Sequence, residues 1–229
     1  MSMQSTHESA VKHGAGRMGF HAIIDDITHM NWSTLSASEL TDVAWAYYYF
    51  SIQFRENLEA ACRLHPEDER LADLNRGERD TDNISPWPGV AKPGEKMHHD
   101  EFMRRTLMLS PIAEAHRQAL EALGRDYLDK VRAFPELTKA MSIASYEDGG
   151  LEAVFTAILK APHWQGETLG AFKHFLAEHI RFDSDPDGGH GALCRHIAPD
   201  NRIEPLWAAF REILAKAVPA LCAKPVTVQ

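Results

Sequence analysis

Helical periodicity runs through most of the 229 residues of this chain. The clearest case is "SASELTDVAWAYYYFSIQFRENLEAACRL", residues 36–64, which opens on a capping-box pattern from Ser36 to Glu39 and continues amphipathically. No segment shows the strict alternation of apolar and polar residues that is typical of a strand. The pattern predicts helices at residues 36–64, 66–78, 95–109, 111–134, 135–161 (interrupted at the double glycine 149–150), 166–182 and 203–223.

These segments predict an all-α fold, a single-domain bundle of seven helices over residues 36–223. A chain of 229 residues is long enough to bury a substantial core within one domain. Residues 1–35 are expected to form a partly irregular N-terminal extension, and residues 224–229 a tail.

Charge and cysteine content exclude several classes of function. The net charge is −9 and no block of lysines and arginines occurs, which argues against nucleic acid or an anionic membrane surface as the partner. No apolar run reaches transmembrane length. The three cysteines lie far apart and form no CxxC pair, so neither a disulfide framework nor a thiolate zinc site is expected. A cytoplasmic protein fits these features best.

A dense group of histidines and aspartates occurs in "HFLAEHIRFDSDPDGGHGALCRH", residues 174–196. Helical geometry places His179 and Asp183 on one face, one turn apart. Pro186 and the glycines after it end the helix, so His190 can fold back towards the same point. Imidazole nitrogen and carboxylate oxygen are ligands of iron, manganese and zinc. The segment is therefore either a metal site or, as the simpler alternative, a helix end followed by an acidic turn.

A metal site inside a helical bundle needs further ligands from facing helices. The candidates are Glu78, Glu95, His98, His99 and Glu147. Glu147 stands among apolar and small residues, where a buried carboxylate needs a partner or a metal; alternatively it lies at a helix end in water. Glu95 and His98 form the single ExxH pattern of the chain, whereas ferritin-like di-iron proteins take two such patterns. The missing second copy counts against a ferritin-like arrangement.

The order of these residues resembles the haem-oxygenase-like non-haem di-iron oxidases and oxygenases. The segment "AEHIRFDSDPDGGHGAL" is similar to the last metal-binding helix of that family, and "IASYEDGGLEAVFTAIL" to the helix of its middle glutamate. The segments "LADLNRGERD" and "HHDEFMRRTL" resemble those of its first glutamate and first histidine. The resemblance covers residues 44–217, nearly the whole predicted domain, and implies a haem-oxygenase-like fold.

Carried over residue by residue, the resemblance implies six iron ligands: Glu78, His99, Glu147, His179, Asp183 and His190. It also implies two Fe(II) ions per chain, O2 as co-substrate, and an oxidase or oxygenase that acts on a small amino-acid, amine or fatty-acid type substrate. A homodimer is an expectation at the level of the family.

The sequence departs from the family pattern at two points. His190 follows Asp183 at a wider spacing than in the family, and residues 84–94 are inserted between the first glutamate and the first histidine. These departures leave three alternatives open: Glu95 in place of Glu78, His98 in place of His99, and Asp187 as one of the late ligands.

Two other kinds of function compete with the di-iron enzyme. One is a metal-free haem-oxygenase-like enzyme of the thiaminase type. If such an enzyme is a hydrolase, it needs a cysteine nucleophile, here Cys62 or Cys194. The other is a non-catalytic helical binding module, in which the acids and histidines are exposed. Haem oxygenase itself needs a proximal histidine early in the chain. The early histidines His21 and His29 precede the first long helix, so haem degradation is not expected. Arg76 or Arg79 is a candidate for a substrate carboxylate, although a solvated ion pair is the simpler interpretation.

Overall fold

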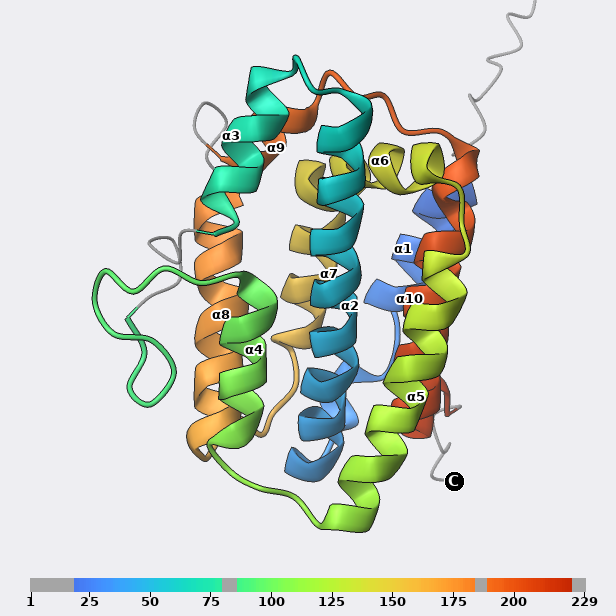
Figure 1. Ribbon diagram of the computed structural model, residues 1–229. Coiled ribbons are helices and arrows are strands. Elements are labelled where there is room, and N and C mark those ends of the chain that lie inside the picture. Colours follow the sequence, from blue (N-terminus) through green and yellow to red (C-terminus); the bar gives the residue numbers. More distant parts are fainter. Residues whose placement is uncertain (1–18, 80–85, 184–188, 224–229) are drawn as a thin grey trace, which may run out of the picture.

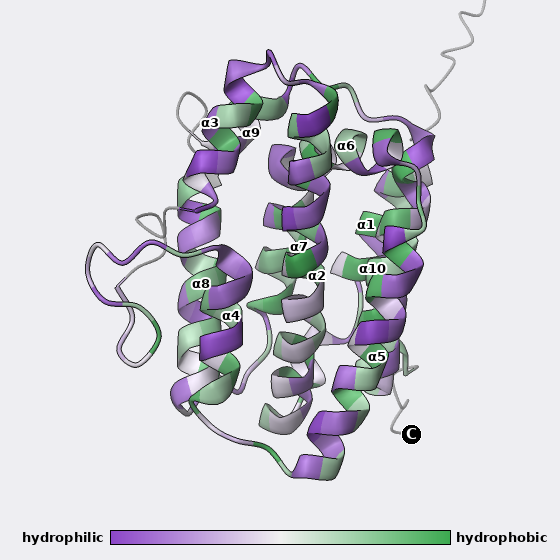
Figure 2. Cartoon of the chain, viewed as in Figure 1, coloured by the Kyte–Doolittle hydropathy of each residue, from purple (hydrophilic) through white to green (hydrophobic). Residues whose placement is uncertain are grey.

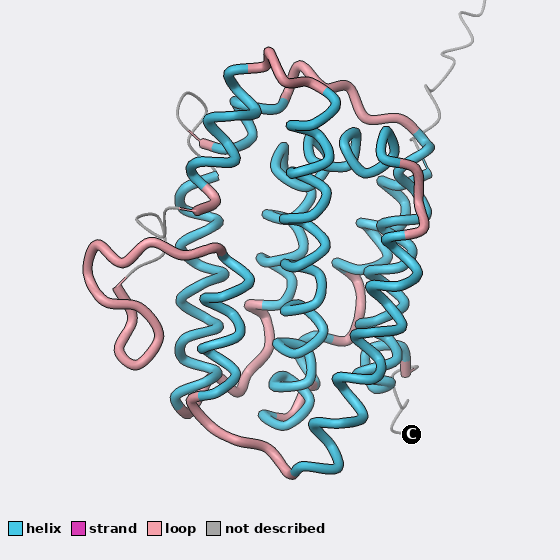
Figure 3. The backbone as a smooth tube through the Cα atoms, in the orientation of Figure 1, coloured by secondary structure: helices cyan, strands magenta, loops and turns pink. Residues whose placement is uncertain are grey.

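The computed structural model describes residues 19–79, 86–183 and 189–223, and the regular secondary structure of this part of the chain is helical (Figure 1). The described ranges contain no β-strand, and Figure 3 shows helices joined by loops. The predicted all-α bundle is therefore confirmed. The α-helices are α1 (Gly19–Thr28), α2 (Ala37–Leu64), α3 (Glu69–Gly77), α4 (His99–Met108), α5 (Glu114–Arg132), α6 (Glu136–Ser145), α7 (Leu151–Ile158), α8 (Glu167–Asp183), α9 (His190–Cys194) and α10 (Glu204–Ala217).

Helix α2 is the centre of the bundle, with α6, α4, α5 and α10 packed around it (Figure 1). Its predicted capping box is present: Ser36 N–H donates to Glu39 Oε2 at 2.8 Å, and Glu39 N–H donates to Ser36 Oγ at 3.3 Å. Tyr47 and Phe50 are buried against the core, which explains why the aromatic run falls on this helix. The outer helices α4 and α5 carry both hydrophilic and hydrophobic residues, as expected for amphipathic helices (Figure 2).

The predicted number of seven helices is too low, and the reason is local in each case. Phe20, Ile24 and Ile27 are buried, so α1 packs against α7 and α10 although it lies in the segment predicted as an N-terminal extension. One predicted helix is divided into α6 and α7. The last addition is α9, a single short turn that begins at His190. Helices this short carry little periodicity, and only tertiary packing stabilises them.

The division between α6 and α7 is a π-helical turn, Tyr146–Gly150. Within it Asp148 has φ −88° and ψ 59°, and Gly149 has φ 91°, so neither is helical. A positive φ is accessible to glycine at little cost, which accounts for Gly149 at this point. π-turns occur often at functional sites, because they turn one side chain away from the regular helical face. Here that side chain is Glu147.

The core of the bundle is apolar and strongly aromatic. Trp32, Trp207 and Tyr146 are its largest fully buried side chains. Both indole N–H groups donate to protein acceptors, Trp32 to the carbonyl of Ile27 at 2.8 Å and Trp207 to Ser145 Oγ at 3.0 Å. Among the helices of the described ranges, none is both long and apolar enough to span a bilayer.

Candidate metal centre

Five of the six predicted ligands lie together in the interior of the bundle. Glu78 follows the end of α3, His99 begins α4, Glu147 stands in the π-turn, His179 belongs to α8 and His190 begins α9. All five are buried, with exposed fractions between 2% and 7%. The sixth, Asp183, is the last residue of α8, and its side chain lies outside the described part of the structure. That these residues bind a metal stays a prediction.

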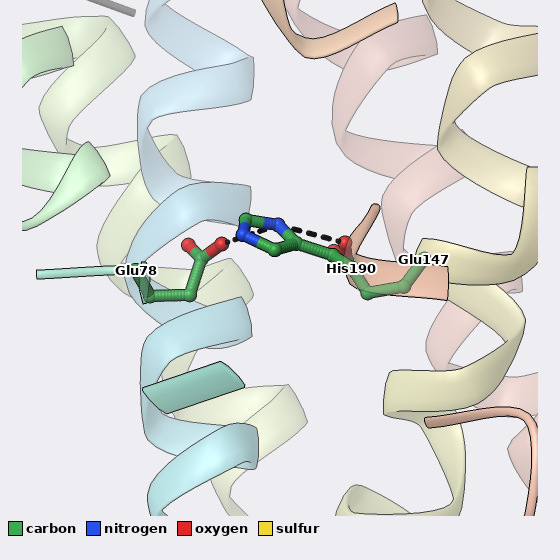
Figure 4. Close-up of side chains that lie close together, drawn as sticks. All are labelled: Glu78, Glu147 and His190. Atoms are coloured by element: carbon green, nitrogen blue, oxygen red, sulfur yellow. Dashed lines mark ion pairs between the residues drawn. The ribbon is translucent and has the colours of Figure 1, made fainter. Parts of the chain in front are cut away.

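One set of three ligand atoms is formed by Glu78, Glu147 and His190, here called the Glu147 set (Figure 4). His190 Nδ1 lies 3.0 Å from Glu78 Oε1 and 3.3 Å from Glu147 Oε2. The three ligand atoms all lie within 4.8 Å of one another. Metal–ligand bonds to imidazole and carboxylate are about 2.0–2.2 Å long, so one ion can reach all three atoms.

A second set, here called the His179 set, uses the other oxygen of Glu78. His99 Nδ1 lies 2.8 Å from Glu78 Oε2 and 3.1 Å from His179 Nε2. On this side of Glu78, His99 therefore lies between Glu78 and His179. Since its two carboxylate oxygens face different sets, Glu78 lies between them and is shared by both.

The backbone of α8 fixes which nitrogen of His179 faces the cluster. His179 Nδ1 lies 2.8 Å from the carbonyl oxygen of Phe175. A carbonyl oxygen only accepts, so Nδ1 carries the hydrogen and donates it. Nε2 then keeps its lone pair, directed at the His179 set. Histidines that bind metals commonly have this arrangement, in which a backbone carbonyl holds the ring and sets its tautomer.

The buried charges shift the protonation of the cluster strongly. Burial opposes the charged form of Glu78, but His99 and His190 outweigh burial and hold its pKa well below the usual range. Burial, together with the charge on Glu78, raises the pKa of Glu147 against the opposing effect of His190. Burial lowers the pKa of His179 to about 3, with a further contribution from His99, so its ring is neutral at pH 7 and available to a metal.

The donor set fits a metal on a further observation. Glu147 Oε2 is a buried oxygen whose contact with His190 Nδ1, at 3.3 Å, is not a well-aligned hydrogen bond. A buried carboxylate oxygen that is only partly satisfied costs stability. A cation bound by the Glu147 set would satisfy this oxygen.

Close packing of α3 against α9 brings Glu78 and His190 together. A Cβ atom at Gly77 would lie 3.2 Å from His190 Nε2, which is tighter than an ordinary contact. A larger residue at this position would push the ring by a few tenths of an ångström. At the far end of the same two helices, His196 pairs with Asp68, which also caps the start of α3. Contacts at both ends fix the position of Glu78.

A small cavity of about 20 Å³ lies beside the cluster. A cavity of this volume holds a species the size of a water molecule or an ion. Besides four of the five candidate ligands, its lining includes Tyr47, Ser51, Phe54, Arg55, His98 and Asp100. Tyr47, Ser51 and Arg55 are spaced at four-residue intervals on one face of α2, a signal that could have identified them from the sequence.

The structure places two of the three alternative ligands, Glu95 and His98, outside both sets. Glu95 lies in the loop before α4, where its Oε1 pairs with Arg105 Nη1 at 2.7 Å, so it does not replace Glu78. His98 is the half-buried residue before α4, and it borders the cavity without joining either set. Asp187 lies outside the described residues. Arg76 is exposed and paired with Asp73, as the simpler interpretation expected.

Comparison with known proteins does not assign this chain to a family. No family model matches it, and neither a curated protein nor a solved structure is significantly similar to it. Any proposal about function therefore depends on the geometry and chemistry of the buried cluster.

Proposed function

We propose that this protein is a non-haem di-iron enzyme of the haem-oxygenase-like type, an O2-dependent oxidase or oxygenase that acts on a small amino-acid, amine or fatty-acid type substrate. The observation that carries the proposal is the position of Glu78, which presents one carboxylate oxygen to the Glu147 set and the other to the His179 set. Two neighbouring sets that share a carboxylate are suited to a pair of metal ions.

The composition of the two sets is compatible with iron. Imidazole and carboxylate together suit iron, manganese and zinc, whereas neither set contains the thiolates typical of structural zinc sites. Bound Fe(II) would supply the electrons that reduce O2. The described residues perform the other tasks: Phe175 holds the ring of His179, Glu78 orients His99 and His190, and the apolar core keeps bulk water out.

A thiol-dependent hydrolase has less support. Cys194 is fully buried and its Sγ lies 3.5 Å from the carbonyl oxygen of His190, an arrangement that suits a structural thiol. Burial raises the pKa of Cys62, which leaves less of the nucleophilic thiolate at pH 7. Neither cysteine lines the cavity beside the cluster. A binding module with an exposed acid and histidine cluster also differs from the buried cluster observed.

The thiols give a direct prediction. Iodoacetamide at pH 7.5 should modify Cys222, which is exposed, and leave Cys194 unmodified until the protein is unfolded. Peptide mass spectrometry after timed labelling measures both. Fast modification of Cys194 or Cys62 in the folded protein, with loss of a hydrolytic activity, would favour the hydrolase instead.

Iron binding tests the proposed function itself. The apoprotein is loaded anaerobically with excess Fe(II), desalted, and assayed for iron per chain and for O2 uptake. We expect about two irons in the wild type and about one or fewer in His179→Ala, because the His179 set loses its neutral imidazole and loss of a ligand greatly lowers affinity.

The matched control is His174→Ala, on the same helix α8 but stacked on Trp87 away from the cluster. It should bind as much iron as the wild type. Equal iron in His179→Ala and the wild type, or no iron in the wild type, would exclude the proposal.

A further inference from the structure

The cavity beside the metal ligands has a charged wall where its lining comes closest to solvent. Arg55 on α2 and Asp100 in the first turn of α4 both line it. Their side chains are 30% and 15% exposed, respectively, and Arg55 Nε donates to Asp100 Oδ2 at 3.1 Å. This ion pair therefore stands between the candidate ligands and the surface.

The ion pairs of Arg55 contain more negative than positive charge. Arg55 also pairs with Glu59, whose Oε1 lies 3.1 Å from its Nη1, so two carboxylates face one guanidinium. Arg55 already has two anionic partners, and a substrate carboxylate would have to displace one of them. A cationic group can instead bind Asp100 Oδ1 while Arg55 keeps Asp100 Oδ2.

One atom in this wall lacks a donor. Asp100 Oδ2 accepts the bond from Arg55, but Asp100 Oδ1 is buried and has no hydrogen bond within the described residues. An ionised carboxylate oxygen accepts hydrogen bonds only, and leaving one unsatisfied is costly. A protonated amine carries three donors and a positive charge, which matches the unsatisfied oxygen and the excess negative charge of these ion pairs.

We propose that Asp100 is a specificity-determining residue, which binds the protonated amine of the substrate at the solvent side of this cavity. Asp100 directly follows His99, so an amine held there lies beside the candidate metal ligands. The inference rests on the proposed function, since it takes the metal sets beside this cavity as the place of reaction. The small cavity receives the amine group alone, and the rest of the substrate extends towards solvent. It selects an amine-bearing substrate and disfavours a simple fatty acid.

The test compares two probes of equal length, hexylamine and hexanoate. Binding is measured calorimetrically at pH 7, where the amine is protonated, on protein loaded with Zn(II), which does not react with O2. Asp100→Asn keeps the shape of the side chain but removes its charge, and should weaken hexylamine binding by about tenfold or more, because a charged hydrogen bond contributes that much. Hexanoate binding should be unchanged or tighter.

Two further variants make the comparison specific. Asp100→Glu keeps the charge and should retain the preference for hexylamine over hexanoate. Asp42→Asn removes another paired aspartate of low exposure, 2.7 Å from His116 and away from the cavity, and should bind hexylamine as the wild type does. Circular dichroism and zinc content confirm that each variant is folded and loaded.

The outcomes separate this inference from the proposed function. If Asp100→Asn binds zinc and hexylamine like the wild type, or if the zinc-loaded wild type binds no hexylamine, the role of Asp100 is wrong while the metal centre stands. If the wild type binds no zinc at all, both proposals fail.

Discussion

Glu78→Gln should abolish metal binding by both sets at once. The substitution keeps the size of the side chain but removes the negative charge that His99 and His190 face at 2.8 and 3.0 Å. Because Glu78 offers one oxygen to each set, no single other candidate ligand has this position. After anaerobic loading with Fe(II) and desalting, we expect iron to fall from about two per chain to well below one, as affinity drops by about 100-fold or more.

Thermal unfolding gives an independent measurement of the same effect. A metal that binds only the folded state stabilises it by about 2.7 kcal/mol when its concentration is 100 times the dissociation constant. Added Fe(II) should therefore raise the melting temperature of the wild type by several degrees and leave that of Glu78→Gln unchanged.

Two other glutamates serve as matched controls for Glu78→Gln. Glu147→Gln alters the Glu147 set alone, so about half of the iron should remain in the His179 set. Glu95→Gln alters a carboxylate that pairs with Arg105 in the loop before α4, so all of the iron should remain. If Glu78→Gln kept two irons, or Glu95→Gln lost them, the assignment of Glu78 as the shared ligand would be wrong.

The choice between neighbouring candidates shows what sequence alone could not supply. His98 and His99 are adjacent, and either could be placed inside by a small change in where α4 begins. In the structure α4 begins at His99, whose side chain enters the core while His98 remains half-buried. Helix starts are the least certain part of any pattern, so the identity of the inward histidine depended on tertiary packing.

The helices themselves were largely predictable, because in long amphipathic segments such as α2 and α5 many apolar residues repeat with the same helical period. The meeting of Glu78, Glu147 and His190 was different, since these residues are far apart in sequence and nothing local brings them together. Their candidacy came from residue type and from the family resemblance. Their proximity depends on the contact of α3 with α9 and on the π-turn.

Gly150→Ala should be among the most destabilising single substitutions in this protein. Gly150 closes the π-turn, and a Cβ atom there would lie 2.0 Å from the carbonyl oxygen of Ser145 and 2.9 Å from the ring of Trp207. Neither neighbour can yield easily, because one is backbone and the other is a fully buried indole. We expect a loss of roughly 2–4 kcal/mol in the free energy of unfolding, about 4–16 °C in melting temperature.

Two glycine variants separate this steric effect from the general effect of replacing glycine. Gly149→Ala meets no atom within 4 Å but has φ 91°, so it should cost about 1–2 kcal/mol through backbone strain alone. Gly170→Ala lies inside α8 at an ordinary 3.5 Å from Trp87 and should be neutral or stabilising by up to about 1 kcal/mol. Because the π-turn also carries Glu147, Gly150→Ala should lower the iron content of folded protein, whereas Gly170→Ala should not. Denaturation curves should rank Gly150→Ala as the least stable variant, followed by Gly149→Ala and then Gly170→Ala. Another order would show that this turn is not the rigid support of Glu147 that its packing indicates.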